Sequence, residues 1–114
     1  MTDARLPAHL EISGIIRAVE AEGGFATVLS KGERDAGTIL IVTLQREGPA
    51  QLYERLPQLD GSRPFVLSRT QDLEKPLDFN EYLTNRSARD PDLWVLELDV
   101  ANPERFAALQ HKLG

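Results

Sequence analysis

The feature that most constrains this chain is an apolar run in the segment TILIVTLQR, residues 38–46. Only two of its first seven residues, both threonines, are polar, which is too few for a strand with one solvent-exposed face. The run is also rich in β-branched residues, which favour strands over helices. We therefore predict a strand at the centre of a sheet that is packed on both faces.

Other segments of the chain predict the neighbours of this strand. Apolar and β-branched stretches bounded by Gly, Pro, Asn and Asp predict further strands at residues 25–31, 51–56, 65–70 and 93–100. Helical spacing of apolar residues, with Pro near each start, predicts helices at residues 7–22 and 77–88. Asn102 and Pro103 predict the start of a closing helix with an apolar face of Phe106, Leu109 and Leu113.

The order of these elements, α-β-β-β-β-α-β-α, predicts an α+β (α/β layered) fold. Strands that follow one another through short turns pair antiparallel, whereas the strand after the second helix can pair in either direction. We expect one twisted five-stranded sheet, largely antiparallel or mixed, packed with three helices in a single globular domain over residues 1–114. Its predicted deep core is Ile15, Val28, Ile39, Ile41 and Leu96.

Composition excludes several classes of function. The net charge is −5, and 13 Lys and Arg are scattered among 18 Asp and Glu, so no basic surface for nucleic acid or an anionic membrane is expected. The absence of cysteine excludes thiolate catalysis, disulfides and iron–sulfur clusters. No run is long and apolar enough for a membrane helix, and no signal peptide is visible, so we expect a cytoplasmic protein.

The segment KGERDAGTILI, residues 31–41, contains most of a phosphate-binding loop. Gly32 and Gly37 have the G-x-x-x-x-G spacing, but the lysine that should follow Gly37 is missing. A strand, rather than a helix, follows the second glycine. We therefore interpret the segment as a hairpin turn between two strands, in which the glycines supply unusual backbone angles.

Polar side chains suggest no catalytic group. His9 and His111 lie far apart in sequence without metal-ligand spacing, and no serine has the context of a nucleophile. The corner Asp90-Pro91-Asp92, beside Arg89, is compatible with two roles. It can hold a divalent cation together with Glu97 or Asp99, or it can be a structural turn, which we favour. We predict no cofactor, no metal and no catalytic residue.

Aromatic residues suggest one core anchor and one surface. Trp94 begins an apolar strand and is expected in the core. Tyr53, in the strand QLYERL, is expected to be partly exposed. With arginines on nearby strands, it can line a shallow surface for a protein partner or a small anionic ligand. The candidate surface residues in all are Tyr53, Arg55, Arg69, Arg89, Asp90, Asp92 and Glu97.

Two stretches resemble the signature blocks of a known family. They are GGFATVLSKGERDAGTI, residues 23–39, and DPDLWVLE, residues 90–97, with Leu52 and Tyr53 between them. In this order and spacing they are similar to a small, mainly alphaproteobacterial family, domain of unknown function 1491. The resemblance implies a small cytoplasmic α/β protein and assigns no catalytic residue.

Two hypotheses of function remain open. The first is a non-enzymatic domain that binds a protein partner or forms a homodimer, and that binds neither nucleic acid nor a membrane. The alternative is an enzyme-like domain that binds a small ligand or metal at the Asp90 and Asp92 corner with nearby arginines.

Overall fold

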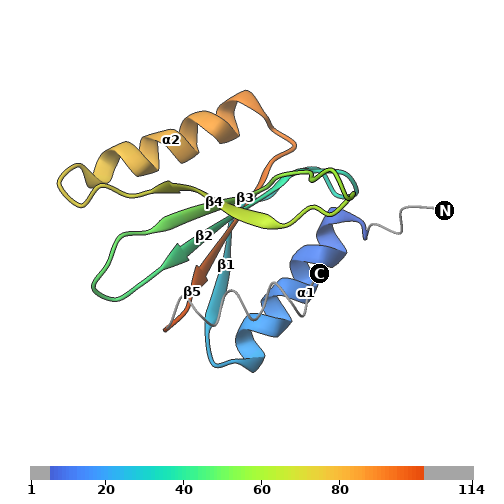
Figure 1. The fold of residues 1–114 in the computed structure, drawn as a ribbon, viewed down its shortest axis with the longest axis horizontal. Helices are drawn as coiled ribbons and strands as arrows, with labels where there is room; N and C mark the ends of the chain where they lie inside the picture. Colours follow the sequence, from blue (N-terminus) through green and yellow to red (C-terminus); the bar gives the residue numbers. More distant parts are fainter. Residues whose placement is uncertain (1–5, 102–114) are drawn as a thin grey trace.

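The structure is a computed structural model that describes residues 6–101, and in this range it forms one sheet between two helices (Figure 1). The sheet has five strands in the order β1-β5-β2-β3-β4. The elements are α1 (Ala8–Ala21), β1 (Phe25–Ser30), β2 (Ile39–Leu44), β3 (Gln51–Arg55), β4 (Phe65–Thr70), α2 (Pro76–Arg89) and β5 (Trp94–Asp99). The five predicted strands and the first two predicted helices are confirmed. The third predicted helix lies outside the described residues.

The sheet is mixed, because β5 is antiparallel to β1 and parallel to β2. β2, β3 and β4 follow as antiparallel neighbours. The predicted hairpin between β1 and β2 is wrong, since β5 lies between these two strands. β2 and β5 are the most deeply buried strands of the sheet, and a strand that is buried on both faces belongs at the centre, with a paired strand on each side.

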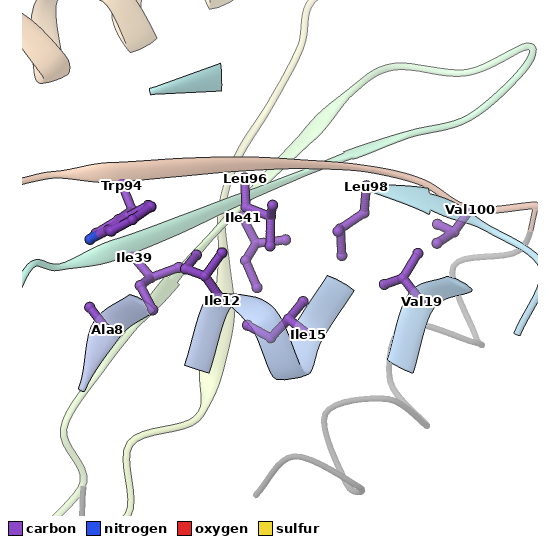
Figure 2. Packing of buried hydrophobic residues seen from close by; sticks show 10 residues of the cluster. All are labelled: Ala8, Ile12, Ile15, Val19, Ile39, Ile41, Trp94, Leu96, Leu98 and Val100. Carbon is purple, nitrogen blue, oxygen red and sulfur yellow. The ribbon is translucent and has the colours of Figure 1, made fainter. Parts of the chain in front are cut away.

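Alternation along β2 and β5 divides the core into two layers. On the α1 side, Ile41, Trp94 and Leu96 contact the buried face of the helix in one cluster (Figure 2). On the α2 side, a second cluster joins Val95 of β5 to Phe79 of the helix, together with Leu40, Val42, Ala50, Leu52 and Leu93. The prediction of a central strand covered on both faces is therefore confirmed.

The predicted deep core is correct at four of its five positions. Ile15, Ile39, Ile41 and Leu96 are buried. Val28 is wrong, because its strand β1 is an edge of the sheet and the side chain keeps 40% of its surface exposed. An edge strand has a neighbour on one side only, so its side chains are covered less than those of a central strand.

The ends of the helices follow from local sequence. Pro7 precedes α1, and the chain leaves the helix through Gly23, whose φ of 85° is in the left-handed region that favours glycine. Pro76 opens α2 at a position where a proline costs no helical hydrogen bond. Within residues 6–101, neither helix has the length and apolar character needed to span a membrane.

Candidate functional site

The two signature stretches of the sequence lie against each other in space. The loop between β1 and β2 packs on the corner that leads into β5, and three hydrogen bonds join them. Glu33 N–H donates to the Asp92 carbonyl at 2.9 Å, and Trp94 N–H donates to the Thr38 carbonyl at 2.8 Å. The indole Nε1–H of Trp94 donates to the Glu33 carbonyl at 2.7 Å. Trp94 is thus the core anchor that we predicted, and it also holds the loop.

The glycines of the loop are required by this close packing. A Cβ on Gly32 would lie 2.6 Å from the carbonyl carbons of both Asp92 and Leu93. A Cβ on Gly37 would lie 2.8 Å from Cδ1 of Trp94. Neither glycine has a positive φ, so the predicted role of unusual backbone angles is wrong. The spacing of the two glycines instead reflects two points where the loop touches the corner.

Four backbone N–H groups of the loop, those of Glu33, Asp35, Ala36 and Gly37, are already used within the protein. Those of Asp35 and Ala36 donate to Oε2 of Glu33, and that of Gly37 donates to the Glu33 carbonyl. A phosphate-binding loop needs such groups free and directed at the ligand. The arrangement therefore supports a structural turn.

The same loop also covers the start of α1. The carbonyls of Asp35 and Arg34 accept the N–H groups of Ala8 and His9, each at 2.9 Å. These donors would otherwise have no partner at a helix N-terminus. Nδ1 of His9 also donates to the Arg34 carbonyl, at 3.0 Å. His9 therefore has a structural contact, and His111 lies outside the described residues.

The Asp90–Asp92 corner is a turn that ends α2. Oδ1 of Asp90 accepts the N–H of Asp92 at 3.0 Å, and its carbonyl accepts the N–H of Leu93 at 3.1 Å. Glu97 lies further along β5, beside Thr27 of β1. In the part of the chain that the structure describes, no three His, Asp or Glu side chains gather as metal ligands. Arg89 stands in the last turn of α2, next to the corner.

The structure does not unite the predicted tyrosine and arginine surface. Arg55 pairs with Glu11 of α1 and donates to its Oε1 at 3.1 Å, and its guanidinium lies 4.5 Å from the centre of the Phe65 ring. Tyr53 shares this α1 side, and its burial raises its pKa. Arg69 lies on the opposite side of the sheet, where it covers the Tyr82 ring of α2.

An irregularity in the pairing of β3 with β4 explains this division. Tyr53 pairs with Leu67, whereas Leu52 pairs with Arg69, so Ser68 is an extra residue in β4. Such a bulge breaks the simple alternation of side chains, and it brings Arg69 to the same side as Leu52. Sequence periodicity cannot reveal a bulge of this kind, because it depends on the partner strand.

A polar cluster on the α2 side joins three elements: Glu54 of β3, Ser68 and Arg69 of β4, and Tyr82 and Arg86 of α2. Nη1 of Arg86 donates to Oε1 of Glu54 and to the hydroxyl of Tyr82, both at 3.0 Å. Ser68 donates to Oε2 of Glu54 at 2.7 Å. The guanidinium carbon of Arg69 lies 3.8 Å from the centre of the Tyr82 ring. We name this group the Arg69 cluster.

Sequence reasoning found only one member of the Arg69 cluster. Tyr82 and Arg86 are four residues apart on one helical face, which was a usable signal. Burial alone would lower the pKa of Arg86, but its hydrogen bonds to Tyr82 and Glu54 outweigh burial and raise it. Tyr82 and Arg86 of α2 thus lie where the side chain of Arg69 projects from β4 onto the α2 side of the sheet.

A second exposed surface lies at the opposite edge of the sheet. The edge strand β1 leaves Phe25 71% exposed and Leu29 50% exposed, in addition to the half-exposed Val28. The register between β1 and β5 shifts between Val28 and Ser30, so Leu29 is an extra residue there. We name Phe25, Val28 and Leu29 the β1 edge.

Comparison with known proteins gives matches over nearly the whole chain. A family model described as "Protein of unknown function (DUF1491)" matches residues 6–108. The crystal structure of a DUF1491 family protein from Caulobacter crescentus is 31% identical with a TM-score of 0.76, over 86% of this chain and 91% of that chain. The solution structure of a protein from A. tumefaciens is also 31% identical, with a TM-score of 0.68, over 86% of this chain and 88% of that chain. No curated protein matches the chain.

Proposed function

We propose that this chain, which belongs to the DUF1491 family of proteins of unknown function, is a non-enzymatic binding domain. It binds a protein partner or a second copy of itself through the β1 edge. The observation that carries this proposal is an edge strand that exposes three apolar side chains, while both faces of the sheet centre are covered.

The β1 edge combines the two properties of a strand that accepts another strand. An edge strand has backbone N–H and C=O groups on its outer side that do not pair within the sheet. Natural edges are often protected by charged residues, but the sequence of β1, FATVLS, contains none. Covering a side chain such as Phe25 contributes about 1.5–3 kcal/mol relative to leaving it exposed. A partner strand can form backbone hydrogen bonds with the first four residues of β1, before the bulge, and these bonds fix how the partner is oriented.

The test compares exposed apolar residues of the β1 edge with an exposed apolar residue elsewhere on the protein. Phe25→Ser and Leu29→Ser change the β1 edge, and Leu77→Ser is the matched control, since Leu77 is 70% exposed on α2. Native mass spectrometry of protein from its own host measures a dimer or a bound partner. Unfolding midpoints equal to that of the parent protein show that each variant folds.

We expect that Phe25→Ser and Leu29→Ser abolish the dimer or the partner complex and that Leu77→Ser preserves it. A dimer that disappears supports self-association, and a heterologous complex that disappears supports a partner. The proposal is wrong if the complexes persist in Phe25→Ser and Leu29→Ser, or if Leu77→Ser weakens them equally.

The alternative, a ligand or metal site at the Asp90 and Asp92 corner, has less support. Asp90 already accepts two backbone N–H groups of its own turn. We also propose a cytoplasmic location, which the family resemblance implies, and fractionation of host cells tests it.

A further inference from the structure

We propose that the Arg69 cluster is a binding site for a carboxylate group, presented by an extended acidic segment of a protein partner. This site lies on the α2 side of the sheet, at the edge strand opposite to β1. It is therefore independent of the β1 edge, and either proposal can fail while the other holds.

Arg69 provides the central cation of the site. Its guanidinium stacks on the Tyr82 ring at 3.8 Å, and the side chain is exposed. Among residues 6–101 no ion pair to Arg69 is formed. Stacking on one face leaves the N–H groups at the rim of the guanidinium free to donate, and it holds the group in one plane. A carboxylate can accept two such bonds side by side.

Arg86 and Glu54 form an ion pair beside Arg69, and their formal charges cancel. Both hydrogens on Nη1 of Arg86 are used, one by Glu54 and one by Tyr82. In the described part of the chain, Nε and Nη2 of Arg86 form no hydrogen bond. The two carboxylate oxygens of Glu54 accept bonds from Arg86 and Ser68, and in the described residues no ion pair joins Glu54 to Arg69.

Tyr82 adds a neutral donor between the two arginines. Its hydroxyl accepts a hydrogen bond from Arg86, so its own proton remains available to an anion. The same ring carries Arg69 on its face, and the guanidinium of Arg86 lies 5.8 Å from its centre. One tyrosine thus positions two cations and contributes a donor itself.

Charge favours a carboxylate as the ligand. Two arginines and one glutamate give the cluster a formal charge of about +1, which matches one carboxylate rather than a dianionic phosphate. The chain as a whole has a net charge of −5, which disfavours a ligand with a large negative charge.

The setting of Arg69 favours an extended peptide as the bearer of that carboxylate. Arg69 lies on β4, the other edge strand of the sheet, so a segment that pairs with β4 passes beside it. The sequence of β4, FVLSRT, has Arg69 as its only charged residue. Leu67 is 46% exposed, but it pairs with Tyr53 and lies on the α1 side of the sheet, opposite to Arg69. An acidic segment that pairs with β4 therefore meets the cation of Arg69 and no negatively charged residue of β4.

The test is a titration followed by NMR of ¹⁵N-labelled protein at constant ionic strength. The probes are the capped peptides acetyl-Val-Thr-Glu-Val-Thr-amide and its Gln counterpart, with inorganic phosphate and succinate as free anions. We expect saturable shifts of the Arg69 Nε–H signal and of β4 amides with the Glu peptide. The Gln peptide should bind about tenfold more weakly, because it lacks the charge-assisted pair.

Variants separate this site from general charge effects. Arg69→Gln should abolish the preference for the Glu peptide, and Tyr82→Phe, which keeps the ring, should reduce it. Arg17→Gln is the matched control, since it removes the same charge from an exposed position on α1. Equal binding of the Glu and Gln peptides, or retention of the preference in Arg69→Gln, would overturn the proposal. Tighter binding of phosphate or succinate than of the Glu peptide would also overturn it.

Discussion

Replacing Gly32 with alanine tests whether the loop between β1 and β2 serves a structural purpose. The added Cβ would lie 2.6 Å from the carbonyl carbons of Asp92 and Leu93. Carbon atoms in contact prefer about 3.5–4.0 Å, so the loop and the corner must separate by about 1 Å. The atoms on both sides belong to the backbone, and no change of rotamer can relieve the clash.

The expected cost follows from three contributions. Overpacking in a well-packed region costs about 1–3 kcal/mol. Separation weakens the bonds from Glu33 N–H to Asp92 and from the Trp94 indole to Glu33, at about 0.5–1.5 kcal/mol each. Alanine lowers the entropy of the unfolded chain and returns about 0.4–1 kcal/mol. We therefore expect a loss of about 1–6 kcal/mol in the free energy of unfolding.

Urea denaturation of Gly32→Ala and the parent protein measures this loss as a lower midpoint with an unchanged slope. Gly14→Ala is the matched control, because Gly14 lies inside α1 and a Cβ there would meet no atom within 4 Å. It should raise the free energy of unfolding by about 0.5–1 kcal/mol through helix propensity. If Gly32→Ala unfolds at the same urea concentration as the parent, the loop does not pack on the corner as described.

The other predictions concern the core and pH. Ile41→Ala should lower the free energy of unfolding by about 2–5 kcal/mol in urea denaturation, because Ile41 is buried in a well-packed layer. Val28→Ala, at the exposed edge, should cost less than half as much, and equal losses would contradict the assigned strand order. Burial raises the pKa of Tyr53, so the folded state keeps its proton where the unfolded state loses it. Stability should therefore fall as pH rises above about 10, and Tyr53→Phe should lack this part of the fall; identical pH profiles would refute it.

Much of the local structure was predictable because it depends on neighbours in sequence. The apolar run of β2 predicted a central strand, and Pro76 predicted the start of α2 within one residue. The position of β5 was not predictable, since its apolar alternation fits several places in a sheet. The exposure of Val28 followed from that position, because the insertion of β5 next to β2 made β1 an edge.

The candidate sites divide in the same way. Arg69 was identified from its strand, but its partner Tyr82 comes from α2 and meets it only because the chain crosses the sheet. Asp92 stood out as a polar residue of the corner, whereas the fold uses its backbone carbonyl, which accepts the N–H of Glu33, to join the corner to the loop. Side-chain chemistry alone could not show that these groups were already occupied.

The amino-acid sequence by itself determined which segments become helices and strands, and it determined that β2 must be buried on both faces. Hydrophobic periodicity and turn residues act over a few positions, so they are readable without a fold. Only the tertiary structure decided that β5 enters between β1 and β2, that Gly32 faces the Asp92 carbonyl, and that Arg69 stacks on Tyr82. These contacts join residues far apart in sequence, and their free energy depends on how whole faces of the sheet are covered.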